Sequence, residues 1–257
     1  MSERPGGTLR VCALYPDLMN IYADRGNLIV LERRCTWRGI AFEASASGLG
    51  DELDPGAHDL YYMGGGQDRD QRLCAEDLLA NKRSALHGAA ARGALVLGVC
   101  GGYQLLGRSY TLDAEEIEGV GLLDITTVRE PGPRLIGNVA IELTGLPGIA
   151  GQQILAGFEN HGGRTYLGEG QSPLGRVLKG HGNDGHSGSE GAVSATTIGT
   201  YLHGPLLPKN PRLADLLLGW ALEHATGARV PLAPLDDALE LLAHSAAIAR
   251  VSERGSA

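Results

Sequence analysis

The first hundred residues alternate short apolar runs with segments of helical length, and this alternation restricts the fold more than any other feature. Four runs of strand length are present, at 9–15, 40–44, 58–66 and 93–100. A segment with helical spacing follows the first run at 27–40, and a longer one precedes the last run at 70–92. Strands and helices that alternate in this way form a parallel sheet with helices on both faces. We therefore predict a three-layer α/β fold with a mostly parallel sheet.

The texture of the sequence changes after about residue 118, where strand-like runs follow one another with little helical periodicity. We interpret these runs as later strands in a mixed extension of the sheet. A glycine-rich loop with a short strand inside it is predicted at 168–191, and helices at 211–225 and 235–249. The predicted division of the chain has three parts: a flexible N-terminal tail at 1–7, one α/β domain at 8–227 and a C-terminal helical tail at 228–257.

Charge and cysteine usage narrow the class of protein. The net charge is −8, from 22 Lys and Arg against 30 Asp and Glu, so no surface for nucleic-acid phosphates is expected. The four cysteines are widely spaced without a CxxC pair, which is typical of a reduced cytosolic protein rather than a zinc ribbon or a disulfide framework. No signal-peptide run or transmembrane window is recognisable. We expect a cytoplasmic protein with at most peripheral contact to the inner face of a membrane.

The stretch VLGVCGGYQLLG, at 96–107, contains the candidate nucleophile. An apolar strand runs directly into Gly98, Val99, Cys100 and Gly101, and a helix-like segment follows. This order is typical of a nucleophile elbow, where a sharp strand-to-helix turn exposes one side chain and the flanking glycines relieve crowding. The N-terminus of the helix favours a thiolate, and its backbone amides can bind an oxyanion. We interpret Cys100 as a catalytic nucleophile rather than a buried structural cysteine.

The segment GVCGGYQ resembles the nucleophile segment of class I, triad-type glutamine amidotransferases, which have a flavodoxin-like α/β fold. These enzymes hydrolyse the side-chain amide of glutamine and deliver the ammonia to a synthetase. The resemblance implies that Cys100 forms a glutamyl thioester and that Gln104 helps to bind the substrate. The spacing agrees with this role, since residues i and i+4 lie on one face of a helix.

A second glycine cluster, YMGGGQDRD at 62–70, follows the third predicted strand, where this family has an oxyanion loop. The resemblance implies that an amide of Gly65 or Gly66, together with that of Gly101, stabilises the oxyanion. The cluster does not fit two rival nucleotide-binding motifs. No GK[ST] follows it as in a P-loop, and the G-x-G-x-x-G pattern breaks at Arg69. A nucleotide site in this chain is therefore not predicted.

Further stretches narrow the resemblance within the family. FENHGGRTYL and GTYLHGP, at 158–167 and 199–205, are similar to the cobyric-acid-synthase-like branch. LYPDLMNIYADRGN and RLIGNVAIEL, at 14–27 and 134–143, resemble the glutaminase subunits that serve MurT, a Mur-ligase-like synthetase. Such pairs amidate D-glutamate of the peptidoglycan precursor lipid II. The match covers most of 9–220 and implies a heterodimer in which the partner holds ATP and Mg²⁺ and binds lipid II.

The resemblance also implies a binding site for glutamine around Arg134. A guanidinium fork suits the substrate carboxylate, and Asn160, His161 and Arg164 are expected to line or support the same pocket. His181 and His186 lie in the glycine-rich loop without partners at ligand spacing, so no metal is predicted.

Two polar residues follow the first predicted strand, at the carboxyl edge where such sheets bind ligands. They are Asp24 and Asn27. For Asn27 we expect only a cap on the helix that begins there.

His203 is the predicted general base, but its orienting acid is missing from the local sequence. Many triad-type amidotransferases have a glutamate two residues after the histidine, and here that position is Pro205. An imidazole base still needs a partner on its second ring nitrogen. A backbone carbonyl, a distant side chain such as Glu159, or a carboxylate of the synthetase subunit would serve. Of these we favour the synthetase carboxylate, because the site must face the partner.

Three other functions remain open from the sequence. The chain could be the amidotransferase part of a system that amidates cobyrinate or another acid. It could be a cysteine hydrolase of another family with the same strand–cysteine–helix geometry. From a different class, it could be a non-catalytic scaffold subunit of the same fold. Covalent labelling of Cys100 by a glutamine-analogue electrophile would separate the enzyme from the scaffold.

Overall fold

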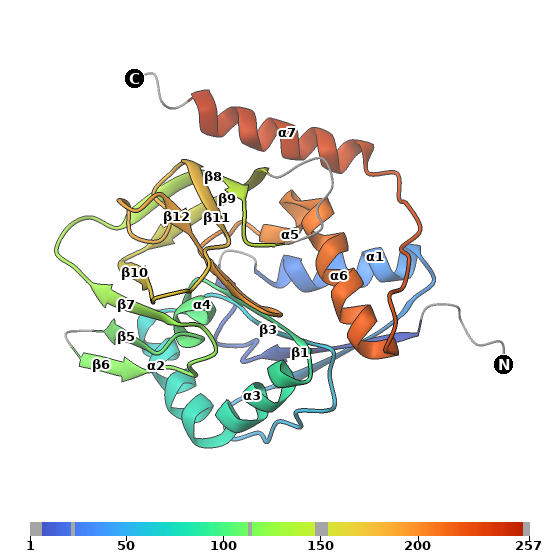
Figure 1. Cartoon of the computed structure of the whole chain (residues 1–257), viewed down its shortest axis with the longest axis horizontal. Coiled ribbons are helices and arrows are strands. Elements are labelled where there is room, and N and C mark those ends of the chain that lie inside the picture. Colours follow the sequence, from blue (N-terminus) through green and yellow to red (C-terminus); the bar gives the residue numbers. More distant parts are fainter. Residues whose placement is uncertain (1–6, 22–23, 113–114, 147–153, 254–257) are drawn as a thin grey trace.

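The computed structural model describes residues 7–21, 24–112, 115–146 and 154–253, so the predicted tail lies outside it except for Gly7. Within these residues the strands form a six-stranded central sheet and two four-stranded sheets beside it (Figure 1). No helix in this part of the chain is long and apolar enough to cross a membrane.

The central sheet has the strand order β13-β14-β4-β3-β1-β2, and every neighbouring pair except β13 and β14 is parallel. Its strands are β1 (Thr8–Leu14), β2 (Ala41–Ser47), β3 (Leu60–Met63), β4 (Leu95–Val99), β13 (Ala192–Ser194) and β14 (Thr197–Thr200). β3 and β4 are buried along their whole length, which explains their unbroken apolar sequences. The predicted parallel sheet is confirmed, and antiparallel β13 makes its edge mixed.

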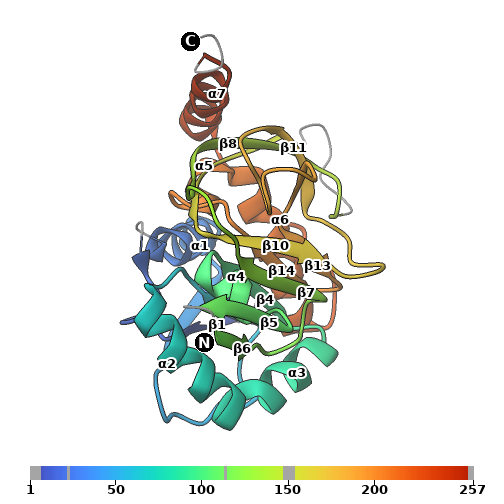
Figure 2. The ribbon, with the colours of Figure 1, turned by 90° about the vertical axis from the view of Figure 1, so that its left-hand side faces the viewer.

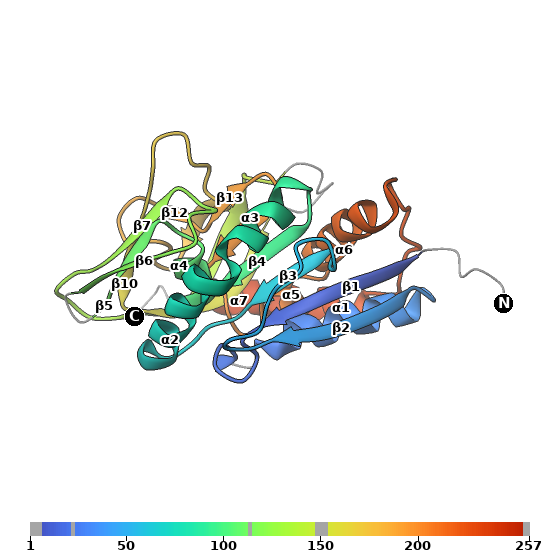
Figure 3. The ribbon, with the colours of Figure 1, turned by 90° about the horizontal axis from the view of Figure 1, so that it is seen from below.

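Helices cover both faces of this sheet. The helices are α1 (Arg25–Trp37), α2 (Asp68–Asp77), α3 (Arg83–Ala91), α4 (Gly101–Leu105), α5 (Leu206–Lys209), α6 (Pro211–Thr226) and α7 (Ala238–Glu253). α1 and α6 lie on one face, and α2 and α3 lie on the other (Figures 1 and 3). The single helix predicted at 70–92 is α2 and α3 joined by a π-helical turn, η2 (Leu78–Lys82). The predicted C-terminal helix begins three residues later than expected and runs to Glu253.

Most of the later strands form two sheets of their own instead of extending the central sheet. One has the order β10-β7-β5-β6 and the other β12-β11-β8-β9 (Figures 1 and 2). Their strands are β5 (Ser109–Leu112), β6 (Glu115–Glu118), β7 (Ile125–Arg129), β8 (Leu135–Leu143), β9 (Ile154–His161), β10 (Gly163–Leu167), β11 (Gly175–Lys179) and β12 (Ser189–Glu190). β9 meets the end of the central sheet, because Phe158 and His203 exchange backbone hydrogen bonds of 3.1 and 2.8 Å. This bridge brings the smaller sheets to the carboxyl edge of β14.

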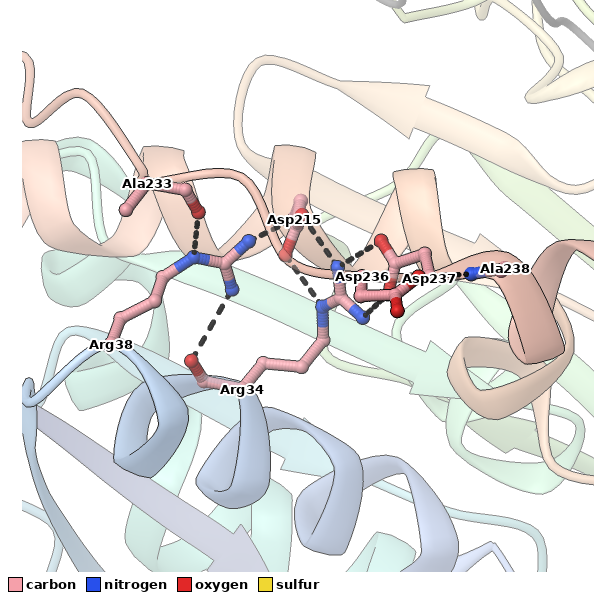
Figure 4. A network of polar contacts seen from close by, with 7 residues as sticks. All are labelled: Arg34, Arg38, Asp215, Ala233, Asp236, Asp237 and Ala238. Atoms are coloured by element: carbon pink, nitrogen blue, oxygen red, sulfur yellow. Dashed lines mark hydrogen bonds and ion pairs between the residues drawn. The ribbon is translucent and has the colours of Figure 1, made fainter.

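A buried arginine on α1 forms ion pairs that hold the segment leading to α7 in place. The guanidinium of Arg34, on α1, is fully buried and donates to Asp215 on α6 at 2.6 Å and to Asp237 at 2.7 Å (Figure 4). Arg38 donates to Asp215 at 2.7 Å and to the carbonyl of Ala233 at 2.7 Å. Bidentate guanidinium–carboxylate pairs are geometrically specific. The network therefore holds the connection between α6 and α7 against α1, while the predicted domain boundaries at 8–227 and 228–257 stay predictions.

Candidate active site

Cys100 occupies a strained turn between β4 and α4. Its backbone has φ +52° and ψ −105°, a region that non-glycine residues rarely adopt, and its side chain is 7% exposed. The turn is tight because a Cβ on Gly98 would lie 2.8 Å from the carbonyl carbon of Gly102. A Cβ on Gly102 would lie 2.3 Å from the carbonyl oxygen of Met63. The elbow predicted from GVCGG is therefore confirmed, and its glycines are required by backbone contacts.

The glycine cluster after β3 packs directly against this turn. The amide of Gly102 donates to the carbonyl of Gly64 at 3.0 Å, and Gly66 lies next to Gly101. The predicted use of the Gly65 amide is wrong, because that amide donates to Asp24 Oδ2 at 2.9 Å. Among the described residues the amide of Gly66 has no protein acceptor, and that of Gly101 is in the first turn of α4, where no intrahelical acceptor exists. Gly66 and Gly101 remain the candidate oxyanion donors.

The carboxylate that orients His203 comes from this chain and not from a partner. His203 Nδ1 lies 3.1 Å from Asp24 Oδ1, and both side chains are fully buried. The carbonyl partner and Glu159 are also excluded for this nitrogen, since Glu159 accepts the amides of His181 and Gly182 at 2.7 and 2.9 Å. The sequence alone places Asp24 at the ligand-facing edge of the sheet and does not identify His203 as its partner.

Asp24 is held by both of its oxygens and by its backbone. Oδ2 accepts from Gly65, and the carbonyl accepts from Tyr62 at 3.1 Å. Asn27 is not the cap of α1, because it is fully buried and its Nδ2 donates to Tyr62 at 2.9 Å. Its Oδ1 accepts from the amide of Leu207 at 2.8 Å, which fixes the chain just after His203. These bonds make the Asp24–His203 pair a rigid unit.

The imidazole of His203 interacts electrostatically with the side chain of Cys100. Burial alone lowers the pKa of His203, but the charge at Cys100 and the hydrogen bonds to Asp24 and Cys100 outweigh it and raise the pKa to about 10. With Nδ1 held by Asp24, Nε2 is the nitrogen left for Cys100. The raised pKa means that the imidazole of His203 holds its proton near neutral pH.

The side chain of Cys100 opens into a cavity of about 170 Å³. The lining includes residues from five regions of the chain: Ile21, Gly66, Asp68, Gln71, Cys100, Gln104, Tyr110, Thr111, Arg129, Arg134, Asn160, His161, Gly162 and Gly163. Ligand sites for drug-sized molecules are larger, roughly 300–1,000 Å³, so this cavity suits one amino acid. The structure thus brings the predicted Cys100, Gln104, Arg134, Asn160 and His161 together.

Gln104 is fixed in the wall of the cavity. Its Oε1 accepts from Gln71 at 2.7 Å and its Nε2 donates to the hydroxyl of Tyr201 at 3.0 Å. Gln104 lines the same cavity as Cys100, and its role in binding glutamine stays a prediction. Gln71 and Tyr201 were not predicted, because they come from α2 and from the end of β14 and only the fold brings them to Gln104.

Arg134 and His161 both line the cavity, but Arg134 is exposed to solvent and His161 is buried. Arg134 is exposed and donates to the side-chain and backbone oxygens of Asn160, at 2.9 and 3.0 Å. His161 stacks on Tyr201 at 3.6 Å between ring centroids, and its Nδ1 bonds the carbonyl of Gly163. Burial lowers the pKa of His161 to about 3, so it is neutral. Arg164 supports the wall from behind by donating to the carbonyl of Gly162 at 3.1 Å.

No group of three or more His, Cys, Asp or Glu side chains in the described ranges is arranged to hold a metal ion. His181 and His186 belong to the loop between β11 and β12, where the backbone amide of His181 donates to Glu159 and that of His186 donates to Asp184. Neither histidine lines the cavity of Cys100.

Comparison with known proteins agrees with this site. The sequence matches the CobB/CobQ-like glutamine amidotransferase domain over residues 10–211. The chain is 35% identical to the lipid II isoglutaminyl synthase (glutamine-hydrolyzing) subunit GatD of Streptococcus pneumoniae, covering 90% of this chain and 87% of that one. It is 37% identical to the GatD subunit of Staphylococcus aureus, covering 93% and 94%.

A solved structure supports the same fold. PurLQS from Thermotoga maritima superposes with a TM-score of 0.58 at 21% identity, over 84% of this chain and 96% of that one. At this identity the likeness concerns the fold alone. The extended sequence matches carry the assignment further: the chain belongs to the CobB/CobQ-like glutamine amidotransferase family and, within it, to the group of the GatD subunits of lipid II isoglutaminyl synthase.

Proposed function

We propose that this chain is the glutamine-hydrolysing subunit of a lipid II isoglutaminyl synthase. The observation that carries the proposal is the line of buried groups Asp24, His203 and Cys100 at the base of a cavity of amino-acid size. The family membership supplies the reaction class. A scaffold subunit would have no need to keep a strained nucleophile turn with a buried acid–base pair behind it.

In this reaction Cys100 acts as the nucleophile and His203 as the acid and base. The thiolate attacks the side-chain carbonyl carbon of glutamine, and the amides of Gly66 and Gly101 stabilise the oxyanion. His203 gives its proton to the leaving nitrogen, the C–N bond breaks, and ammonia and a glutamyl thioester result. His203 then takes a proton from water, which attacks the thioester and releases glutamate and the thiolate.

The cavity distinguishes the two ends of the substrate by charge. Arg134 lines the cavity and binds the α-carboxylate of glutamine. Its Nε and Nη2 donate to Asn160, so Nη1 is the nitrogen that can donate to the substrate. Asp68 lines the same cavity and supplies the negative charge that the α-ammonium group requires. Gln104 borders the reacting amide.

The synthetase half belongs to a partner. We propose a heterodimer with a MurT-type Mur-ligase-like subunit that binds ATP, Mg²⁺ and lipid II in the cytoplasm and receives the ammonia. The GatD relatives are named as subunits of such a synthase. The chain is also 40% identical over 162 residues to a cobyric acid synthase, so amidation of a cobyrinate-type acid remains the alternative.

The test combines hydrolysis with amidation. The chain is purified with its Mur-ligase-like partner, and glutamate release and ATP-dependent amidation of lipid II are followed. Cys100→Ala should abolish both, since removing a nucleophile costs several orders of magnitude in rate. Cys35→Ala, which removes a buried thiol of α1 away from the cavity, should leave both in place. Full glutamate release by folded Cys100→Ala would rule out the proposal, and amidation of cobyrinate instead of lipid II would favour the alternative.

A further inference from the structure

We propose that Arg129 is a second guanidinium for the α-carboxylate of L-glutamine, acting beside Arg134 as a substrate-specificity residue. The inference rests on the proposed glutaminase function. Arg129 ends β7 and has no signal in the local sequence, whereas Arg134 stands in a segment typical of the family.

The two guanidinium groups lie next to each other over Gly162. A Cβ built on Gly162 would be 1.4 Å from Arg129 Nη1 and 3.3 Å from Arg134 Nη1. Because both nitrogens are this close to one point, they can bind the two oxygens of a single carboxylate. Gly162 also lines the cavity into which Cys100 opens, so the pair belongs to the substrate site.

Neither arginine is neutralised by an acid within the described part of the chain. The acceptors of Arg134 are the uncharged oxygens of Asn160, and Arg129 forms no ion pair. Other exposed arginines differ in this respect, since Arg108 pairs with Asp124 and Arg176 with Glu142. Two adjacent like charges repel each other, and an anion bound between them removes that cost.

The absence of a side chain at Gly162 makes room for this arrangement. Any Cβ at this position would overlap Arg129 Nη1, so the arginine covers the glycine backbone directly. The contact atom is the far end of a flexible side chain. A small residue here would therefore push Arg129 aside without disrupting the strand pairing of Arg129 with Gly163.

A carboxylate is the anion that fits the geometry and the reaction. A forked guanidinium pair binds a planar carboxylate through parallel N–H···O bonds. L-Glutamine carries one such group at the end opposite to the amide that Cys100 attacks. Arg129 thus contributes to recognising a free amino acid rather than an amide within a peptide.

The experiment compares electrophiles with and without an α-carboxylate in the complex with its partner. Wild type, Arg129→Gln and the matched control Arg176→Gln are treated with 6-diazo-5-oxo-L-norleucine, which has this group, and with iodoacetamide, which lacks it. KM and kcat for L-glutamine are measured in parallel. Arg176 is a comparable exposed strand arginine outside the cavity.

The expected result is a selective defect in Arg129→Gln. KM for glutamine rises and inactivation by the norleucine analogue slows, each roughly 10- to 100-fold. A change of this size corresponds to the loss of one charge-assisted hydrogen bond. kcat and alkylation by iodoacetamide stay within about twofold, since those do not use the carboxylate. Gly162→Ala, which displaces Arg129 without removing it, should give a weaker defect of the same kind.

Two results would overturn the inference. An unchanged KM and unchanged inactivation by the norleucine analogue would show that Arg129 does not touch the carboxylate. Equal slowing with both electrophiles would assign Arg129 a merely structural effect. Failure of the proposed function is seen separately, as wild-type protein whose Cys100 reacts with iodoacetamide while it neither hydrolyses glutamine nor reacts with the analogue.

Discussion

Asp24 and His203 stand 179 positions apart in the sequence, and their side chains meet at 3.1 Å in a fully buried contact. Asp24 follows β1 and His203 follows β14, and these strands are separated in the sheet by β3 and β4. The carboxyl ends of parallel strands share one edge, so the fold itself brings the two residues to Cys100 at the end of β4. The site is therefore complete within one chain, and assembly is not needed to supply the acid.

Asp24→Asn should lower kcat for glutamine hydrolysis by about 10²- to 10⁴-fold with little change in fold, because the amide keeps the shape but not the charge. The pKa of His203, raised to about 10 in part by Asp24, should fall. Stopped assays give kcat, and the imidazole ¹⁵N shifts, assigned with His203→Gln, report the protonation of His203.

The chain contains a matched control for this change. Asp59, which directly precedes β3, pairs with His224 Nδ1 at 2.9 Å, and neither residue lines the cavity. Asp59→Asn should leave kcat unchanged. If Asp24→Asn and Asp59→Asn behaved alike, Asp24 would have no special role in orienting His203.

The sequence predicts the central fold well, because its signals are local. The two central strands β3 and β4 are apolar runs, and the nucleophile turn needs glycines on both sides of Cys100. The hairpin of β5 and β6 was missed because its second strand reads Glu-Glu-Ile-Glu, and three charges hide the strand pattern.

The acid and one wall of the pocket could not be predicted in the same way. The residues after His203 include Pro205 where a glutamate is common, and nothing near them points to a carboxylate in the first loop. Gln71 and Arg129 likewise line the cavity only through tertiary contacts, and Tyr201 reaches Gln104 in the same way. Asp24 had one usable signal, its place at the ligand-facing edge of the sheet, which located it without giving its partner.

Glu190 should make the protein less stable as the pH rises. It is fully buried, and burial raises its pKa from 4.5 to about 8. A raised carboxyl pKa contributes stability below pH 4.5 that is lost as the pH rises through 8, because the unfolded chain releases the proton earlier. Each such group changes the free energy of unfolding by at most about 1.4 kcal/mol per pH unit.

Glu190→Gln should flatten this dependence between pH 4.5 and 8, as measured by urea unfolding at several pH values. In the wild type the backbone N–H of Tyr201 donates to Glu190 Oε1 at 2.6 Å. The side-chain oxygen of the glutamine can accept the same hydrogen bond. Glu142→Gln, which removes a surface carboxyl paired with Arg176, is the control and should leave the curve as in wild type. Parallel curves for wild type and Glu190→Gln would disprove the assignment.

Arg34→Ala should destabilise the protein by about 3 kcal/mol, near the lower end of the cost of breaking a buried ion pair. The partners Asp215 and Asp237 are 27% and 18% exposed, so the carboxylates left without a partner can reach water.

Because Asp237 precedes α7, Asp237→Asn should also speed proteolysis between α6 and α7. Arg176→Ala breaks only a surface pair and should cost under about 1 kcal/mol. Equal unfolding free energies for the two alanine variants would contradict the role given to Arg34.

Gly65→Ala should impair hydrolysis by displacing the base. An added Cβ would lie 2.9 Å from His203 Cε1 and 2.9 Å from Ile21 Cγ1, closer than such contacts occur. His203 is fully buried and held by Asp24, so it cannot yield without weakening that hydrogen bond. We expect kcat to fall by about 10²-fold or more, since displacing a catalytic group by about 1 Å lowers the rate by this order. Gly137→Ala, on β8 with open space around the new Cβ, should keep wild-type kcat, and full activity of Gly65→Ala would show that the loop can move away from the imidazole.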